Sequence, residues 1–287
     1  KWTMKRHYRS ESGGILILIV CVIFVVFLPV FLLLGQLGPH FIANERVHTA
    51  VEAASVLAAN DLARIVINDP NFGYVSLSNY PPVGKATCAP DGEPLPVIGI
   101  NTLVGTLRQN AIIADELNNE AMHSHVDADL AALNSTINEL NAKVESSLAD
   151  TSKITCVDMD GNVVDTVEDV KAFLEEALPS NVRLESVNLS HGWLRGGSTT
   201  TIAVPRPLQL AQVKPKDIQG GHYKAFMDFP VGGRKFSLAG LGSHSSMVDS
   251  AEFEEADGKH ICSIVKLECT VVLKEAPFST VQCVVCS

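Results

Sequence analysis

The chain has 287 residues, a formal net charge of −10 and an aromatic content of only 6%. The acidic balance argues against a nucleic-acid ligand, because beyond a short N-terminal cluster there is no basic stripe to follow a phosphate backbone. The low aromatic content argues against a groove that stacks carbohydrate rings. Beyond the N-terminal segment the chain is long enough for one or two compact domains.

An uninterrupted apolar run from Ile15 to Leu34 dominates the N-terminal part. At about 1.5 Å per residue it matches the roughly 30 Å hydrocarbon core of a bilayer. It predicts one transmembrane helix over 15–35, in which Pro29 introduces a kink. A basic segment, 1–14, precedes it and is expected in the cytoplasm, with the bulk of the chain periplasmic or extracellular. A cleaved secretory signal is the alternative, but the run is long and no A-x-A motif follows it.

Two contrasting segments follow the apolar run. Residues 40–69 are rich in alanine with apolar positions near helical spacing, and they predict a membrane-proximal helix that ends at Asn68-Asp69-Pro70. Residues 70–97 are rich in proline, glycine, serine and asparagine. They predict an irregular loop with one short strand at Gly73–Leu77.

Residues 98–150 carry the strongest helical pattern outside the apolar run. Apolar residues alternate in steps of four and three, at Val126, Leu130, Leu133, Ile137, Leu140 and Val144. A break near His123-Ser124-His125 would divide the segment into two helices. Two interpretations remain open: a coiled-coil arm for oligomerisation, and an intramolecular helical hairpin that packs on residues 41–68.

Residues 151–287 predict a disulfide-containing α+β domain that ends in a mostly antiparallel sheet. A helix is expected over Thr166–Leu178, capped by Thr166 and closed by Pro179. Strands are expected at Lys153–Val157, Asn162–Asp165, Val182–Val187, Tyr223–Phe229, Lys235–Leu238, Cys262–Leu273 and Thr280–Cys286. Asp160-Gly161 is typical of a hairpin turn.

The cysteines beyond the apolar run are even in number and indicate an oxidising compartment: Cys88, Cys156, Cys262, Cys269, Cys283 and Cys286. Zinc is disfavoured because Cys283-x-x-Cys286 has no second closely spaced pair. If residues 274–278 form a turn, Cys269 and Cys283 face each other on antiparallel strands. Cys88 and Cys156 flank the helical region, so a bond between them would join its two ends.

No sequence motif supports catalysis, a metal or a cofactor. Gly240–Ser246 does not match the G-x-S-x-G nucleophile motif. His123 and His125 are two residues apart, which on a helix points them away from each other. The sequence Asp158-x-Asp160-Gly161-Asn162 lacks the rest of a calcium loop and predicts a plain turn. We therefore expect no enzyme activity, no metal ion and no cofactor.

The N-terminal 70 residues resemble the TadE/TadG-like proteins of bacterial tight-adherence (Flp-type) pilus assembly. The resemblance rests on a basic start, Ser12-Gly13-Gly14, an apolar run containing Phe27-Leu28-Pro29-Val30, and Asn44-Glu45-Arg46-Val47 leading into an Ala-rich helix. Pseudopilins of this system carry glutamate five residues after the processing glycine, where this chain has Ile19. The uncleaved TadG-like type is therefore the better match, although the D-x-S-x-S motif of its larger members is absent.

The resemblance implies a bacterial inner membrane and partners in a pilus or secretion machine. The expected function is that of a non-catalytic, single-pass envelope protein with a structural or assembly role. Its expected partners are the lipid bilayer, envelope proteins and further copies of itself. The main alternative is a membrane-anchored adhesin or receptor whose C-terminal domain binds an external ligand, and the third is a secreted or anchored hydrolase.

Overall fold

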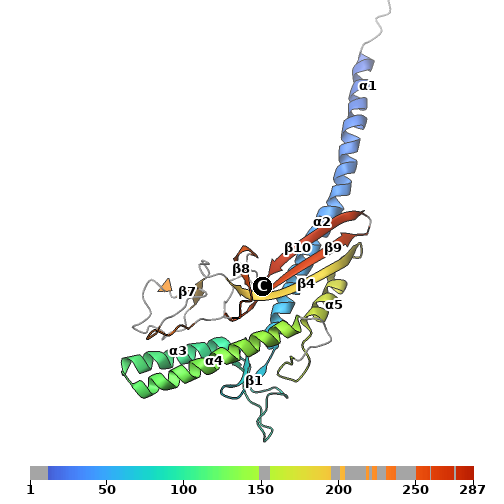
Figure 1. Ribbon diagram of the computed structural model, residues 1–287. Helices are drawn as coiled ribbons and strands as arrows, with labels where there is room; N and C mark the ends of the chain where they lie inside the picture. The colour runs from blue at the N-terminus through green and yellow to red at the C-terminus, as the bar shows by residue number, and fades with distance from the viewer. Residues whose placement is uncertain are drawn as a thin grey trace, which may run out of the picture. The chain divides into compact units, whose positions relative to one another are not determined.

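The computed structural model describes residues 12–148, 156–194, 201–203, 218–219, 222–224, 231–236, 250–258, 260–274 and 276–287. The chain forms two compact units, Lys1–Val47 and His48–Ser287. It is an α+β protein, in agreement with the expected class. Figure 1 shows the elements in chain order.

The expected transmembrane helix over residues 15–35 is wrong. Among the helices of the described ranges, none combines the length and the apolar character needed to cross a membrane. The apolar run is divided between α1 (Ser12–Val22), a π-helical turn η1 (Ile23–Phe27) and the start of α2 (Leu28–Arg64). With 11 residues α1 is too short, and α2 soon becomes alanine-rich and polar.

The π-helical turn lies immediately before the proline of the run. The backbone N–H of Leu28 donates to the carbonyl of Ile23, five residues back, and Pro29 follows in the first turn of α2. Proline has no N–H to donate, and at the start of a helix this donor is not needed. Pro29 is therefore accommodated where one helical segment passes into the next.

In the second unit, α2 buries an alanine-rich face that includes Ala54, Ala58 and Leu62. The helix ends at Arg64, earlier than the predicted 69, because the chain becomes extended in β1 (Ile67–Asp69). β1 pairs antiparallel with β2 (Gly73–Ser76), and β2 pairs parallel with β3 (Ile98–Gly99). The short strand predicted at Gly73–Leu77 is thus part of a small sheet.

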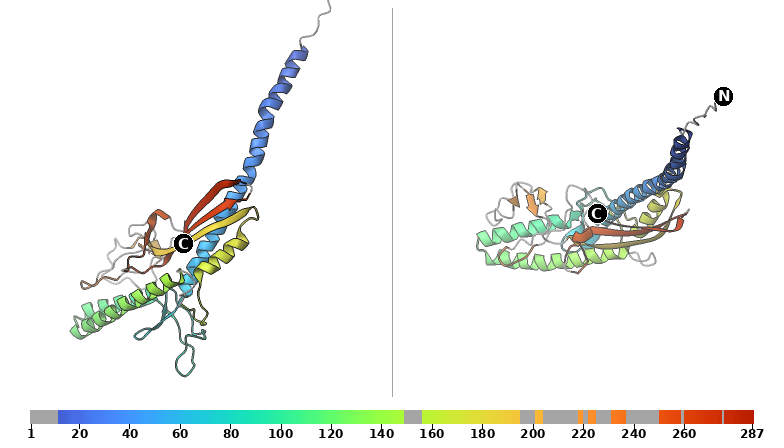
Figure 2. Two further views of the ribbon diagram at one scale, coloured as in Figure 1. Left: turned by 45° about the vertical axis from the view of Figure 1, so that its right-hand side comes forward. Right: turned by 90° about the horizontal axis from the view of Figure 1, so that it is seen from above.

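The helical region forms a hairpin of α3 (Ile100–Glu116) and α4 (Glu120–Ser147), which lie side by side in Figures 1 and 2. The break predicted at His123–His125 is wrong, since it falls at residues 117–119. Asn118 adopts a positive φ of 47°, a conformation that asparagine tolerates well. The side chain of Asn119 then accepts from the N–H of Met122 and caps α4.

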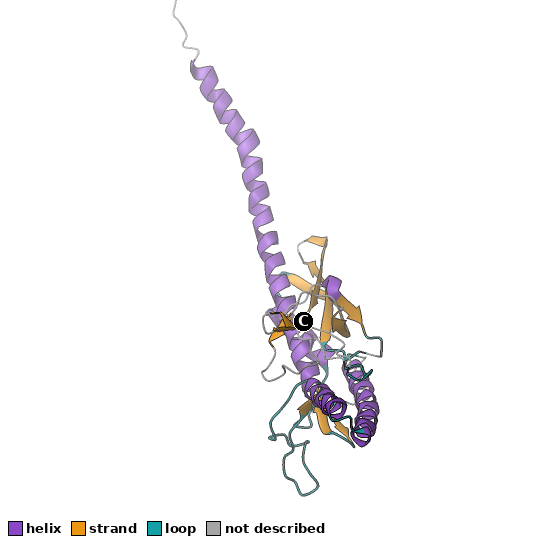
Figure 3. Ribbon diagram, turned by 90° about the vertical axis from the view of Figure 1, so that its left-hand side faces the viewer, coloured by secondary structure: helices purple, strands orange, loops and turns teal. Residues whose placement is uncertain are grey.

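A four-stranded antiparallel sheet dominates the C-terminal part, in the order β10-β9-β4-β8. Its strands are β4 (Val182–Leu194), β8 (Phe253–Glu255), β9 (Ile264–Leu273) and β10 (Ala276–Cys286), with a 3₁₀ turn at Ser250–Glu252 before β8. A separate small sheet contains β5 (Thr201–Ala203), β6 (Ile218–Gln219) and β7 (His222–Lys224). Figure 3 colours these strands apart from the helices.

Helix α5 (Thr166–Ala177) precedes β4 and nearly matches the predicted helix. Its cap differs: the Asp165 side chain, not Thr166, accepts from the N–H of Glu168. Thr166 itself is fully buried. Asp165 is preferred because a charged oxygen makes a stronger bond to the unpaired N–H groups of the first turn.

Several strand predictions need correction or lie outside the described residues. Val157 and Val163 form an isolated bridge rather than the two predicted strands. Lys235 and Phe236 are not in a strand. Residues 153–155, 225–229 and 237–238 lie outside the described ranges.

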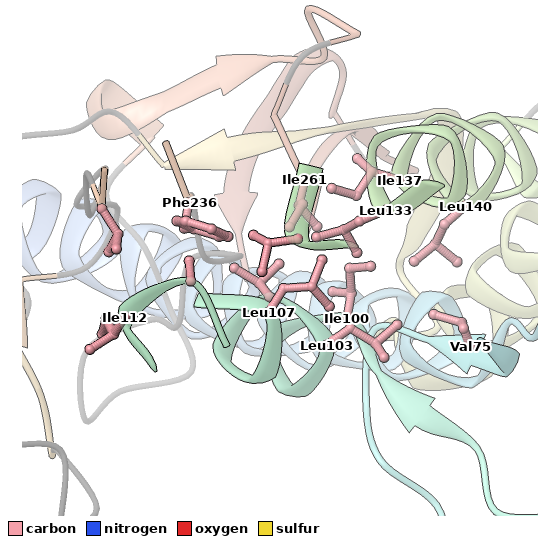
Figure 4. Packing of buried hydrophobic residues seen from close by; sticks show 14 of the residues in the cluster. Val75, Ile100, Leu103, Leu107, Ile112, Leu133, Ile137, Leu140, Phe236 and Ile261 are labelled. Carbon is pink, nitrogen blue, oxygen red and sulfur yellow. The ribbon is translucent and has the colours of Figure 1, made fainter. Parts of the chain in front are cut away.

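One hydrophobic core lies between the two helices of the hairpin and the segments next to them. Figure 4 shows Leu103 and Leu107 of α3 facing Leu133 and Ile137 of α4. Phe236, from the turn segment 231–236, is only 1% exposed and packs into the same cluster. The apolar seam of α4 is therefore covered from within the chain.

Candidate interaction surface

The apolar side chains from Ile17 to Phe31 form a continuous exposed run, whereas the other exposed large apolar residues of the described chain occur singly. The exposed fractions of the large residues range from 43% at Val20 to 72% at Val25. Single exposed apolar residues are ordinary on protein surfaces, but a contiguous apolar surface marks a site of interaction. We define residues 17–31 as the apolar segment.

The apolar segment has no polar side. Every residue from 17 to 31 is exposed, so the apolar side chains are presented all round the helix. No Asp, Glu, Lys or Arg occurs between Glu11 and Glu45. Apolar contact is therefore its only strong interaction. Burying each side chain against a partner is favourable by about 25 cal/mol per Å² of apolar area removed from water.

The six predicted helix-packing residues all lie on α4. Val126, Leu133, Ile137 and Leu140 are buried in the hairpin core, and Leu130 is partly buried against it. Val144 is fully buried one turn further on. The structure thus places the heptad seam within an intramolecular hairpin and leaves no continuous apolar stripe of α4 for another copy.

The seven cysteines are free thiols in this structure. The expected facing of Cys269 and Cys283 is present, since they are direct partners in the β9–β10 register. Cys88 donates to the carbonyls of Gly84 and Lys85, whereas Cys156 donates to that of Val164. Burial raises the pKa of Cys262 to about 12, aided by the charges of Asp257 and Glu145. Cys286 is fully buried.

A polar cluster at the free end of the hairpin was not predicted from sequence. The guanidinium of Arg234 donates from Nε and Nη2 to the two carboxylate oxygens of Asp127, at 2.6 and 3.0 Å. Arg234 ends a tight turn in which Gly232 and Gly233 have positive φ, and a Cβ on Gly232 would meet Asp115 at 2.6 Å. The Gly-Gly pair signals a turn, but which helix receives it depends on the fold.

A second group brings Trp193 of β4 to His260, whose rings stack at a centroid distance of 3.9 Å. The Nδ1 of His260 lies 2.7 Å from a carboxylate oxygen of Asp257. The backbone carbonyl of His260 accepts from Asn141 of α4, which ties the hairpin to the approach to β9. Among the described residues, no three histidine, cysteine or carboxylate side chains gather as metal ligands.

Comparison with known proteins yielded no matching family model and no similar curated protein or solved structure. The resemblance of the N-terminal 70 residues to TadE/TadG-like proteins therefore stays a prediction.

Proposed function

We propose that this protein is a non-catalytic structural or assembly component of a pilus or secretion-type machine, of the TadE/TadG-like kind. Its place is the inner membrane of a bacterial envelope. Its partners are other envelope proteins, further copies of this chain and the lipid of that membrane.

The observation that carries the proposal is the exposure of the apolar segment. A helical surface that is apolar on every side is stable only when apolar material covers it. Subunits of an assembly supply such cover, whereas an isolated enzyme or receptor gains nothing from leaving these residues in water. Because no Asp, Glu, Lys or Arg lies between Glu11 and Glu45, this stretch offers no charge to attract an ionic partner.

The second unit supports the proposal in a different way. Its hairpin and sheet are joined by buried polar contacts, such as the two hydrogen bonds of Asn141 to His260 and Cys262. Satisfied buried polar contacts specify one arrangement of the packed elements. We propose that this unit is presented to partners as a rigid body, while the apolar segment supplies the attachment.

The test is site-specific crosslinking of the full-length protein in native membranes. A photo-crosslinker at Phe24, which is 61% exposed and next to Val25, should capture defined partners: a pilin, a platform protein, a secretion ATPase or another copy. Val25→Asp should reduce recovery of those partners by about 100-fold or more, because an unpaired carboxylate is costly in an apolar interface. Val25→Leu is the matched variant and should retain them.

A crosslinker at Asn138, an exposed polar position on α4, controls for chance proximity. Equal partner recovery by the Val25→Asp and Val25→Leu variants would contradict the proposal. If the crosslinker at Phe24 captures nothing and the second unit binds an external ligand, the adhesin or receptor would be favoured.

A further inference from the structure

The hairpin of β9 and β10 places two cysteines at one rung of the sheet. Cys269 and Cys283 are direct Cα partners, and the register runs without a break from Val272–Thr280 to Lys266–Cys286. The side chains of directly paired residues point to the same face of a sheet. We propose that Cys269 and Cys283 are a disulfide-forming site that staples the edge strand β10 to β9.

The Cα spacing of this rung lies within the range of a disulfide, whereas its Cβ atoms stand further apart than the about 3.5–4.5 Å of a closed bond. The two strands therefore draw together slightly when the Sγ–Sγ bond closes. Val265 and Ser287 exchange both backbone hydrogen bonds, at 2.8 and 2.9 Å. Hydrogen-bonded and non-hydrogen-bonded pairs alternate along an antiparallel ladder, so the rung four residues away is again a hydrogen-bonded pair. Such pairs have Cα atoms about 5.5 Å apart, within the range that a disulfide bridges. Burial raises the pKa of Cys269 to about 11, and the nearby Cys283 contributes.

The two thiols lie on the core face of the sheet. They are 2% and 6% exposed, and their neighbours on the same face, Leu267 and Val285, are also buried. The opposite face carries the ion pair of Lys266 and Glu268 and the exposed Val284. An oxidant therefore cannot reach the thiols after folding, and the bond forms while the strands are still assembling.

The oxidant is a small disulfide such as oxidised glutathione. The thiolate of one cysteine attacks a glutathione sulfur, which gives a mixed disulfide and releases one glutathione thiolate. The second cysteine thiolate then attacks the protein sulfur of the mixed disulfide, forms the Sγ–Sγ bond and releases the second. The protein loses two electrons to glutathione and two protons to the released thiolates.

The position of β10 explains what the bond would protect. β10 is at the edge of the four-stranded sheet, where strands are prone to detach or pair wrongly. At its C-terminal end the Ser287 hydroxyl donates to the carbonyl of Ser55 in α2, at 2.6 Å. A covalent link in the same hairpin keeps that end of the chain in place. This inference does not depend on the proposed function.

The test refolds the full chain with oxidised glutathione or with a reductant and maps the cysteines by alkylation and peptide analysis. Oxidative refolding should yield a Cys269–Cys283 bond, and reduction should lower the Tm by about 5–10 °C. The Cys286→Ala variant, changed three residues along β10, should keep the difference in Tm between oxidised and reduced protein. The Cys269→Ala variant should lose that difference. Folded, reduced protein should oxidise at least about 10-fold more slowly than refolding protein.

Recovery of both thiols free after oxidative refolding would overturn the inference, and so would a bond from either cysteine to a different one. If Cys269→Ala does not fold, the alkylation map of the wild-type chain still decides, since it needs no variant.

Discussion

Replacing Asp69 with alanine should destabilise the protein by about 2–4 kcal/mol. One carboxylate oxygen accepts from the backbone N–H groups of Asn71 and Phe72, at 2.7 and 3.0 Å, and forms the turn between β1 and β2. The other accepts from the hydroxyl of Thr136 on α4, at 2.6 Å. Asp69 is 5% exposed and Thr136 fully buried, so water cannot replace the lost partner. Urea or thermal unfolding measures the change.

Asp69→Asn is the matched variant. It should lose less stability than Asp69→Ala, because its amide oxygen still accepts from the two backbone N–H groups. Thr136→Val removes only the hydroxyl, whose alternative acceptor is the carbonyl of Ala132 at 3.0 Å. The Asp69→Ala and Thr136→Val changes should therefore be non-additive in a double-mutant cycle. Additive losses would show that the two side chains are not energetically coupled.

Lowering the pH should reduce the difference in free energy of unfolding between wild type and Asp69→Ala. Burial opposes ionisation of Asp69, but hydrogen bonds from Thr136, Asn71 and Phe72 outweigh it and lower the pKa below the ordinary 3.8. A lowered carboxyl pKa contributes stability above the unfolded pKa, and this stability is lost as pH falls through the folded value. Unfolding measured between pH 7 and pH 3 should show this convergence.

Asp61→Asn should have the opposite effect and stabilise the protein at pH 7 by up to about 3 kcal/mol. Asp61 is 5% exposed on α2, and within the described part of the chain its Oδ2 has no hydrogen-bond partner. Burial raises its pKa to about 6, and the charge of Asp169 adds to this while Arg64 opposes it. At neutral pH the folded protein therefore holds a poorly solvated carboxylate.

The sign of this pH dependence follows from the raised pKa. The stability that Asp61 contributes is complete below the unfolded value of 3.8 and is lost as pH rises through about 6. Wild type should lose stability over that window relative to Asp61→Asn, and the two should converge near pH 4. Asp129→Asn, at an exposed site on α4, is the control. Its free energy of unfolding should change with pH in parallel with that of wild type. If the free energy of unfolding of Asp61→Asn changed with pH in parallel with that of wild type, the raised pKa of Asp61 would be contradicted.

Local sequence patterns correctly predicted much of the secondary structure. Heptad spacing located α4, the Thr166–Leu178 pattern located α5, and alternation with a short turn brought Cys269 opposite Cys283. Helix ends were less predictable: α2 ended at Arg64, and the hairpin turned at Asn118. Residues near an end have similar local preferences on both sides, so packing decides where the helix stops.

The sequence by itself determined that this is an α+β chain with a helical middle, a C-terminal sheet and an uncharged apolar run near its start. Those features follow from side-chain periodicity over a few residues. The tertiary structure decided that the apolar run is divided at η1 and that the α4 seam packs on α3. It also decided that Asp69 meets Thr136, 67 residues away. Burial and hydrogen-bond partners of this kind arise only when distant segments pack together, and local propensity carries no information about them.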